Sequence, residues 1–321
     1  MRITLKQLTH ARALAGHGSF REAAAALNLT QPALTRSIQS LEHALGVTLF
    51  DRLAGGVEPT EFGTILLGKA RAILQESGEL EREMLLLRGL QTGSLSVAAG
   101  PYPACELVPR AAAGCLERIP DLRCRLLIGP WKDTAQLLLD RECELAVAEL
   151  SDAAADTRFA TTALGEDLLQ FVCRSSHPLA ARPGPTLTEV LSYPLAACRV
   201  PARMTPLFAR SPRAGSIDPA NGDFLPAFHV ESVAAAVEIV MSSDAVTAVP
   251  LGLVARQLQS GELVALDLRE NPVRLHAGVI QLQGRAVSPA AKLFVEHLVR
   301  VKQELSARDM RLRELVANRV G

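Results

Sequence analysis

Apolar positions near the N-terminus repeat at the spacing of an α-helix. Steps of four, three and four residues place one apolar stripe on a single helix face, formed by Leu34, Ile38, Leu41 and Leu45. Thr30 lies just before this segment and can cap its first turn, where Pro32 is tolerated because first-turn N–H groups have no intrahelical partner. Gly46 follows the last apolar position, so we predict a helix that ends there.

A second, shorter helix is predicted directly upstream. Ser19 and Glu22 have the spacing of a capping box, which places the start of this helix at Phe20. Its alanine-rich run ends at residue 27, and residues 28–29 separate it from the longer helix. Two helices joined by so short a turn form a helix-turn-helix. Residues 47–58 then predict a small hairpin, the wing of a winged helix.

The exposed face of the longer helix carries side chains that suit a DNA groove. Arginine pairs with guanine, glutamine with adenine, and threonine or a small apolar group contacts the thymine methyl. The helix N-terminus also favours a phosphate through its N–H groups and dipole. This face contains Pro32, Arg36, Gln39 and His43, with Thr35 at its edge. Taken singly, Gln39 and His43 are more typical of a solvated helix face, and Arg52 in the wing is a candidate phosphate contact.

The order of these signals resembles the N-terminal domain of LysR-type transcriptional regulators. The matching positions are Gly18, Ser19, Phe20, Ala23, Ala24, Leu27, Thr30, Gln31, Pro32, Ala33, Leu34, Arg36, Ile38, Leu41, Glu42, Leu45, Gly46, Leu49, Phe50, Arg52, Thr60 and Gly63. Thr35 departs from the family, which commonly has serine there, and residues 53–56 lack an additional basic residue often found in the wing. The resemblance and the exposed face together imply DNA contacts by Ser19, Thr30, Gln31, Pro32, Ala33, Thr35, Arg36, Gln39, Arg52 and Thr60.

A long helix is predicted after Thr60, which can cap it, and it extends to about residue 88. Apolar residues alternate along it at steps of four and three, the pattern of a coiled-coil seam, while charged residues fill its outer face. In the LysR family the matching segment is the dimerisation helix. The resemblance therefore implies pairing with a second copy through Leu66, Ala70, Ile73, Leu80, Met84 and Leu87. A surface helix packed on its own effector domain is the alternative.

The remainder of the chain alternates short apolar strands with helices, after a predicted linker at residues 90–93. Expected strands cover residues 95–99, 123–128, 145–148, 167–173, 195–199, 228–230, 245–249, 263–268 and 275–282. Expected helices cover residues 106–119, 134–141, 232–241 and 289–305. This alternation predicts a mainly parallel sheet with helices on both faces, arranged as two α/β lobes.

The two-lobed pattern resembles the LysR effector domain, which is itself similar to periplasmic binding proteins. The expected fold class is α/β, with an α-rich N-terminal winged helix-turn-helix, a long dimerisation helix and this effector domain. The expected boundaries are 1–60 for the winged helix-turn-helix, 61–92 for the linker helix and hinge, 93–305 for the effector domain and 306–321 for a C-terminal tail. Lobe I is expected to take residues 93–163 and 267–305, and lobe II residues 164–266.

An effector site is predicted between the two lobes, because ligands of open α/β sheets bind beyond the carboxyl ends of the strands. The loops expected there carry the only tryptophan of the chain and one of its two tyrosines, with Arg199 and Arg203 beside them. This predicts a partly aromatic or apolar ligand, with an acid group as a further option. Trp131 and Phe228 as ordinary core residues are the alternative. The expected effector contacts are Pro101, Tyr102, Pro103, Trp131, Val200, Pro201, Arg203, Met204, Phe228 and His229.

The overall charge does not favour indiscriminate binding to nucleic acid. The chain has 34 basic and 34 acidic side chains, so DNA affinity must come from their local placement. Aromatic residues make up 4%, which argues against a platform that stacks single-stranded bases. No apolar run reaches membrane-spanning length and no signal-peptide pattern is present, which predicts a cytoplasmic protein with no membrane partner.

The cysteines do not form a recognisable metal or disulfide pattern. They are Cys105, Cys115, Cys124, Cys143, Cys173 and Cys198, with no C-x-x-C pair and no histidine at ligand spacing. We therefore predict no metal site and no disulfide framework, and we interpret these residues as small buried apolar side chains. Thiol-based redox sensing, as in some LysR-type regulators, is the alternative.

The motifs favour a regulator over an enzyme. No dinucleotide-binding, P-loop or G-x-S-x-G motif is present, so no catalytic or cofactor-binding residues are predicted, and an enzyme on an α/β fold is the less favoured function. The predicted function is a sequence-specific transcriptional regulator whose binding or bending of DNA is modulated by a small-molecule effector between the lobes. Expected partners are double-stranded DNA with an inverted repeat, the effector, further copies of the chain in a homodimer or homotetramer, and RNA polymerase.

Overall fold

The computed structural model describes residues 3–53, 56–87, 93–209 and 211–320. Its contacts divide the chain into two compact units, Met1–Leu90 and Gln91–Gly321. We call them the N-terminal unit and the C-terminal unit. The predicted linker at residues 90–93 falls at this division, although residues 90–92 lie outside the described part. None of the described helices combines the length and apolar character needed to cross a membrane.

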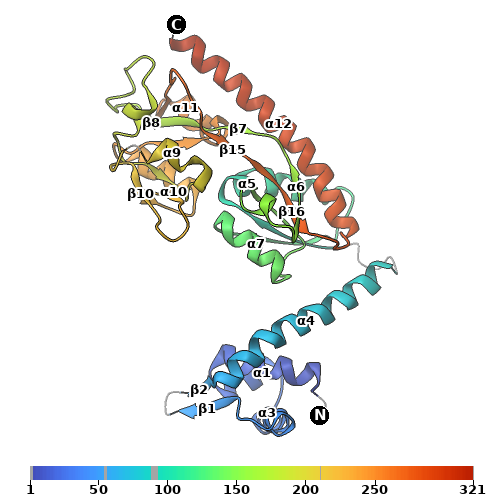
Figure 1. The fold of residues 1–321 in the computed structure, drawn as a ribbon. Coiled ribbons are helices and arrows are strands. Elements are labelled where there is room, and N and C mark those ends of the chain that lie inside the picture. Colours follow the sequence, from blue (N-terminus) through green and yellow to red (C-terminus); the bar gives the residue numbers. More distant parts are fainter. Residues whose placement is uncertain (1–2, 54–55, 88–92, 210, 321) are drawn as a thin grey trace. The chain divides into compact units, whose positions relative to one another are not determined.

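The N-terminal unit contains the predicted winged helix-turn-helix (Figure 1). Its elements are α1 Leu5–His17, α2 Phe20–Ala26, α3 Gln31–Leu45, β1 Phe50–Leu53 and β2 Gly56–Pro59. The predicted apolar stripe of α3 forms its core, since Leu34 and Leu41 are fully buried and Ile38 is 2% exposed. The strands β1 and β2 pair in antiparallel fashion, which confirms the hairpin, and its tip at residues 54–55 lies outside the described part.

The ends of these helices show which cap predictions hold. Thr30 caps α3 as predicted, because its Oγ1 accepts a hydrogen bond from the N–H of Ala33 at 3.4 Å. Gly46 ends the helix with φ 73°, a left-handed conformation that glycine adopts easily. The capping box predicted for α2 is wrong, because Ser19 occupies the N-cap position without a side-chain capping bond. Burial of Phe20 holds α2 in place instead, since packing of an apolar face outweighs the contribution of a cap.

The long helix is α4, Glu61–Leu87, as predicted. Thr60 caps it, since its Oγ1 accepts from the N–H of Gly63 at 3.1 Å and donates to the carbonyl of Thr48 at 2.8 Å. Gly63 is required because a Cβ at this position would lie 2.1 Å from the carbonyl oxygen of Leu49. The start of α4 is therefore fixed tightly against the segment that leads into the wing.

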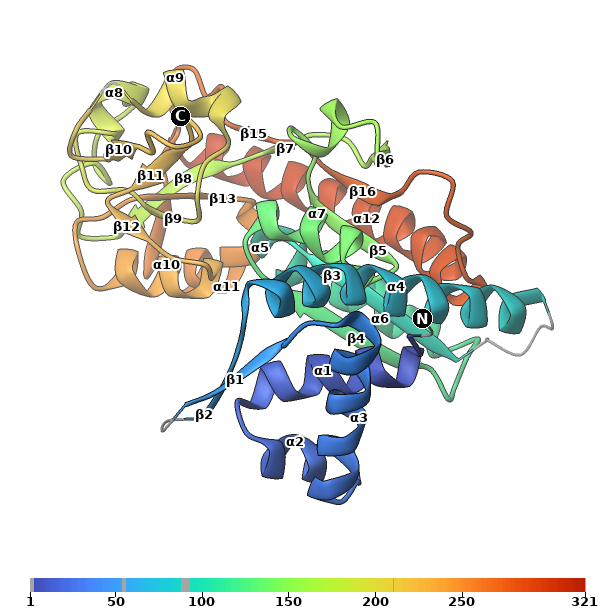
Figure 2. The same cartoon turned by 60° about the horizontal axis from the view of Figure 1, so that its bottom comes forward.

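The predicted seam of α4 divides into two parts. Leu66 is half-buried against the core of its own unit and Ala70 is fully buried, so these two predicted dimerisation residues are largely covered within one copy of the chain. Their position follows from the first turns of α4, which lie along α1 (Figure 2). Further along, Ile73, Leu80 and Met84 are 48%, 58% and 48% exposed. The side chain of Leu87 lies outside the described part.

Lobe I of the C-terminal unit is a five-stranded sheet in the order β4-β3-β5-β16-β6. Its strands are β3 Ser94–Ala99, β4 Arg123–Ile128, β5 Leu145–Glu149, β6 Phe159–Ala163 and β16 Ala277–Leu282. Its helices are α5 Pro101–Cys105, α6 Leu107–Cys115, α7 Trp131–Leu139 and the short η1 Ala153–Ala155. The predicted helix at 106–119 is shorter than expected, whereas the proline-containing loop at 101–105 is helical, because proline fits a first helical turn.

Lobe II is built around the strand β8 Gln170–Arg174, which lies between two other strands. Its remaining strands are β9 Ala196–Ala197, β10 Gly215–Ile217, β11 Phe224–Pro226, β12 Phe228–His229, β13 Thr247–Val249 and β14 Leu263–Ala265. Its helices are α8 Leu187–Val190, η2 Ala202–Met204, α9 Thr205–Phe208, α10 Val233–Met241, η3 Leu251–Val254 and α11 Ala255–Ser260.

The prediction of a mainly parallel sheet needs correction in both lobes. β3 pairs in parallel with β4 and β5, but β16 is antiparallel to β5 and β6. In lobe II, β8 is antiparallel to β13 and β14, whereas β12 and β9 are parallel. β8 and β16 are the strands by which the chain enters each lobe from the other, and each runs against its neighbours. β10 and β11 form a further antiparallel pair in lobe II.

Two short strands cross between the lobes, β7 Asp167–Leu168 and β15 Arg274–Leu275, and they pair with each other. Residues just before β15, including Leu268 and Val273, pack in the core of lobe II. The chain therefore returns to lobe I at β16, later than the predicted boundary at residue 267.

The last helix is longer than predicted. α12 spans Pro289–Val320, so the tail expected at residues 306–321 is wrong through residue 320. Leu298 and Val301 pack in the core of lobe I, whereas Leu312 and Val316 pack against lobe II. The helix thus runs along both lobes (Figures 1 and 2). The helical spacing of apolar residues continues through Leu305, Leu312 and Val316. This spacing is the feature of the sequence that indicates the longer helix.

Candidate functional site

The exposed face of α3 offers the predicted DNA-contacting side chains to solvent. Gln31, Pro32, Arg36 and Gln39 are exposed, while Ala33 and Thr35 are half-buried. The Nε of Arg36 donates to the carbonyl of Pro32 at 3.3 Å, which turns this side chain back toward the start of α3. The arrangement keeps a guanidinium beside the helix N-terminus, where phosphates and base edges are bound in helix-turn-helix proteins.

Other predicted DNA contacts have different surroundings. Arg52 of β1 is exposed, and its guanidinium carbon lies 4.9 Å from the centroid of the Phe20 ring. This cation–π contact fixes the orientation of a charge that points to solvent. Ser19 is half-buried. The hydroxyl of Thr60 is engaged within the chain by Thr48 and Gly63, so its visible role is to cap α4.

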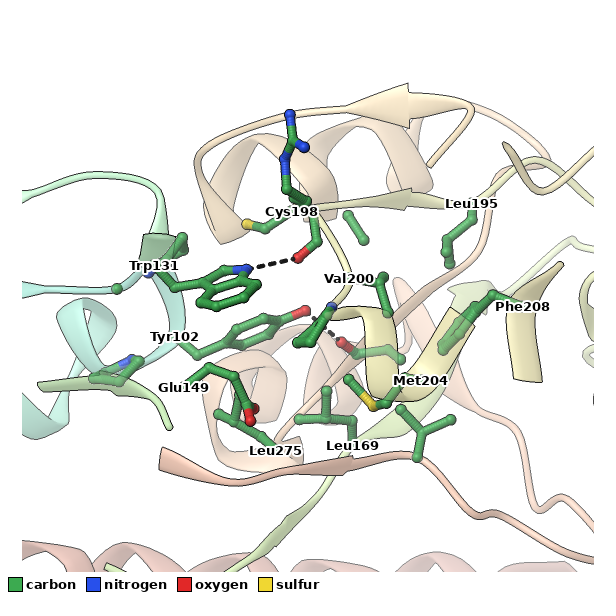
Figure 3. A pocket seen from close by; sticks show the side chains of 18 residues that line it. Tyr102, Trp131, Glu149, Leu169, Leu195, Cys198, Val200, Met204, Phe208 and Leu275 are labelled. Atoms are coloured by element: carbon green, nitrogen blue, oxygen red, sulfur yellow. Dashed lines mark hydrogen bonds between the residues drawn. The ribbon is translucent and has the colours of Figure 1, made fainter. Parts of the chain in front are cut away.

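The second site is a cavity between the lobes of the C-terminal unit (Figure 3). Its empty space of about 580 Å³ includes space open to solvent. Seven of the predicted effector contacts line it, namely Pro101, Tyr102, Pro103, Trp131, Val200, Pro201 and Met204. Tyr102 and Trp131 come from lobe I, whereas Leu195 and Phe208 come from lobe II and lie on the other side of the cavity. The lining is overwhelmingly apolar, which suits a hydrophobic ligand.

Three predicted contacts do not line the cavity. Phe228 is 45% exposed on the edge strand β12, and His229 pairs with Glu231 at 2.9 Å. Arg203 reaches a lining residue, Glu149, rather than the cavity itself. Phe228 and His229 therefore lie outside this cavity, on a two-residue strand where both are exposed, and their contact with an effector stays a prediction.

Several lining residues were not among the expected effector contacts: Gly100, Glu149, Leu169, Leu195, Ala197, Cys198, Arg199, Phe208, Ala248, Val273 and Leu275. Most are apolar strand residues, which sequence patterns cannot distinguish from ordinary core. For Glu149 the sequence does contain an indication of a functional residue, because a carboxylate ends the fully buried strand β5.

Two hydrogen bonds cross the cavity from lobe I to lobe II. The hydroxyl of Tyr102 donates to the carbonyl of Ala248 at 3.1 Å, and the indole Nε1 of Trp131 donates to the carbonyl of Arg199 at 3.3 Å (Figure 3). Burial raises the pKa of Tyr102, and the nearby thiols of Cys198 and Cys105 add to this effect. The phenol therefore stays protonated and keeps donating across physiological pH.

The third link between the lobes is an ion pair. Arg203 of lobe II donates to both carboxylate oxygens of Glu149, at 3.2 and 3.0 Å. The Glu149 side chain is 2% exposed and that of Arg203 is 28% exposed. A buried pair with two parallel bonds fixes orientation strongly. The cavity is thus enclosed by two lobes that hold each other through Tyr102, Trp131 and Arg203.

The surroundings of the cysteines disfavour redox sensing. Burial raises the pKa of Cys105 to about 11, and of Cys143, Cys173 and Cys198 each to about 12. Burial also raises the pKa of Cys115 and of Cys124. Cys105 and Cys124 are nevertheless exposed at the residue level, so the interpretation of all six cysteines as buried side chains is wrong for these two. Thiols of this kind are protonated near neutral pH, whereas the reactive form is the thiolate. Among the described residues, no group of three potential metal ligands is close enough to hold an ion.

Comparisons with known proteins identify the family to which the two units belong. The family model for the bacterial regulatory helix-turn-helix protein, lysR family, matches residues 5–64, and that for the LysR substrate binding domain matches residues 88–303. The chain belongs to the LysR family of transcriptional regulators, with a DNA-binding helix-turn-helix in the N-terminal unit and an effector-binding domain in the C-terminal unit.

Full-length relatives support this membership. The SDS degradation transcriptional activation protein of Pseudomonas sp. (strain ATCC 19151) is 36% identical over 292 residues, 90% of this chain and 93% of the relative. The regulator CbbR of Sinorhizobium medicae is 28% identical over 309 residues, 92% and 93% of the two chains. In fold, the chain is similar to full-length CbnR in complex with its target DNA, with a TM-score of 0.64 at 23% identity and coverage of 93% and 99%.

Proposed function

We propose that this regulator responds to a small, largely apolar molecule with an extended hydrocarbon portion, bound in the cavity between the lobes. The observation that carries the proposal is the lining. Aliphatic, aromatic and proline side chains form most of the lining, and only two lining residues of the described chain carry a formal charge, Glu149 and Arg199. Burial of apolar ligand surface contributes about 25 cal/mol per Å² in such a site.

The name of one relative fits a ligand of this class. The Pseudomonas protein is named for activating SDS degradation, and SDS carries an unbranched alkyl chain. The two proteins share 36% identity over most of their lengths, and an alkyl chain is the kind of group that the cavity of this chain would accommodate.

Switching follows from the position of the cavity. A ligand changes DNA binding only by as much as it favours one arrangement of the lobes over another. Tyr102, Trp131 and Arg203 each bridge the lobes beside the ligand space, so a ligand that displaces or supports these contacts shifts the balance between arrangements.

Assembly through α4 completes the proposed function. Ile73, Leu80 and Met84 are apolar and exposed on the part of α4 beyond its own unit's core. Two copies that pair along this surface would carry two winged helices and read an inverted repeat in DNA.

Ligand binding can be tested by thermal unfolding with alkan-1-ols of six to ten carbons. At a hundredfold excess over the dissociation constant a ligand adds about 2.7 kcal/mol of stability. The variant Val200→Phe fills the cavity and should lose most of this gain. Val299→Phe is the matched control, because Val299 is 41% exposed on α12. Absence of stabilisation at every chain length, or full stabilisation of Val200→Phe, would contradict the proposal.

A reporter assay separates the cavity from the thiols. Trp131→Phe removes the indole donor to Arg199 while keeping an aromatic ring, so it should bind operator DNA but respond weakly to the alcohol. Cys105→Ser and Cys198→Ser should keep most of the response, and peroxide should have no effect on any of them. Redox sensing would be favoured instead if a cysteine variant lost the reporter response while the Trp131 variant remained fully inducible.

A further inference from the structure

The charges beside the cavity are paired before any ligand enters. Arg199 is one of the two charged residues that line the space, and its Nη1 lies 2.7 Å from Asp218 and 3.5 Å from Asp223. The Asp223 side chain is 1% exposed. Its second oxygen, Oδ1, has no hydrogen-bond partner in the described part of the chain. The guanidinium of Arg199 therefore already serves two carboxylates.

Glu149, the other charged lining residue, is saturated with hydrogen bonds. Besides its two bonds from Arg203, its Oε1 accepts from the hydroxyl of Ser151 at 2.7 Å, and its Oε2 accepts from the backbone N–H of His276 at 3.0 Å. Four hydrogen bonds, two of them from Arg203, satisfy the lone pairs of this carboxylate. Glu149 thus presents a fixed negative charge at one side of an otherwise apolar space.

The third cation near the rim is also engaged. The Nζ of Lys132 lies 2.7 Å from Asp223 and 3.6 Å from Asp152. Around the cavity, the three cations Lys132, Arg199 and Arg203 are thus matched by the four carboxylates Glu149, Asp152, Asp218 and Asp223, a surplus of one negative charge. An anionic ligand would lose its hydration and find each of these cations already paired.

From this arrangement we infer that the effector is a neutral amphiphile, an alkyl chain with an uncharged polar end such as an alcohol, and that Glu149 excludes anionic analogues. The inference rests on the proposed function and specifies its ligand class. Burial of an unpaired anion costs far more than burial of a hydroxyl, which needs a single hydrogen bond. Repulsion by the buried Glu149 carboxylate adds to that cost, because the cavity is shielded from water.

The test compares two probes with the same chain, octan-1-ol and sodium octyl sulfate, with the full-length protein below the micelle concentration. Calorimetric titration of the wild-type protein should show octyl sulfate binding weaker by on the order of a hundredfold. This measurement needs no variant, so it stands even if a substitution at the buried site prevents folding.

The variant Glu149→Gln tests whether Glu149 causes the preference for the alcohol over the sulfate. It keeps the shape of the side chain, removes the buried negative charge and leaves Arg203 without its carboxylate partner. The preference for the alcohol should fall at least tenfold. Glu231→Gln is the matched control, because Glu231 pairs with His229 outside the cavity, and it should keep the wild-type preference.

Each outcome bears on a separate statement. Equal or tighter binding of octyl sulfate to the wild-type protein overturns the neutral-ligand inference and leaves the apolar cavity as the proposed effector site. An unchanged preference in Glu149→Gln overturns the assignment to Glu149. Failure of both probes to bind overturns the proposed function itself.

Discussion

The two units of this chain place their functional side chains in opposite environments. In the N-terminal unit, Arg36, Gln39 and Arg52 are exposed, and the core beneath them consists of apolar residues that do not reach DNA. In the C-terminal unit, Tyr102 and Glu149 face a cavity, and the same side chains hold the two lobes together. A DNA surface can thus change without loss of stability, whereas the effector site cannot.

The difference has a physical reason. DNA is a large polyanion that meets the protein surface, so its contacts need solvent-exposed charges and donors. A small apolar ligand gains its affinity from removal of its surface from water, so its contacts must be buried. Polar groups at a buried site need partners of their own, which explains why Glu149 has four donors.

The largest expected effect concerns the exposed seam of α4. Ile73→Asp places a carboxylate where two copies are proposed to meet, while Ile73 is 48% exposed within its own unit. The stability of the unit should stay within about 0.5 kcal/mol of wild type. Operator affinity should fall about 100- to 10,000-fold, because the second winged helix no longer binds in the same assembly. Sedimentation and operator titration check this prediction. A mutant that remains dimeric and binds operator DNA with normal affinity would contradict it.

The second-largest effect is expected at the ion pair between Arg203 and Glu149, which joins the two lobes. Arg203→Met leaves the buried carboxylate of Glu149 without its cation, and partial exposure of Arg203 moderates the effect. We expect a loss of about 2–3 kcal/mol in the free energy of unfolding, measured by urea denaturation. Arg158→Met is the control, since the Arg158–Asp156 pair lies at the surface, where solvent screening leaves an ion pair with little effect on stability. Equal losses in the two variants would refute a structural role for the Arg203–Glu149 pair.

A smaller effect is expected at the DNA surface. Arg36→Ala should weaken operator binding by about 1–3 kcal/mol and relax base preference, while Arg52→Ala should weaken all sequences alike and reduce the salt dependence. Neither change should lower the unfolding free energy by more than about 0.5 kcal/mol, because both residues are exposed. Unchanged affinity of Arg36→Ala for operator and random DNA would show that another face of α3 reads the bases.

The smallest effect depends on pH. Burial raises the pKa of Asp309 on α12, although the N–H of Gly252 donates to it at 3.0 Å and Arg308 lies nearby. An acid with a raised pKa in the folded state lowers stability once it ionises, and this penalty disappears as pH falls below the pKa of the unfolded chain. Asp309→Asn should therefore be more stable than wild type at neutral pH, by no more than about 1 kcal/mol, and the difference should vanish near pH 3. Chemical denaturation at both pH values checks the sign, and a variant that is less stable at pH 7 would contradict it.

Most of the helix-turn-helix could be predicted from the sequence, although the capping box expected at Ser19 is absent. The apolar stripe of α3, the cap at Thr30 and the stop at Gly46 all appear in the structure as predicted. These features depend on contacts between residues close in sequence, and the 3.6-residue period reports directly which face of a helix is buried. The same reasoning located β4 and the start of α12 in the C-terminal unit.

The effector site, by contrast, is built by contacts between elements that lie far apart in the sequence. The spacing of apolar residues shows which face of its own helix or strand a residue occupies. It does not show which distant element packs against that face. The pairing of Arg203 with Glu149 joins positions 54 residues apart on different lobes. Phe228 matched the expected chemistry, yet its short strand turns outward at 45% exposure. Leu66 and Ala70 matched a dimer seam, but α1 of the same chain already covers that part of α4. In each case the outcome depends on long-range packing, where the topology of the whole unit selects one partner among many apolar or charged candidates.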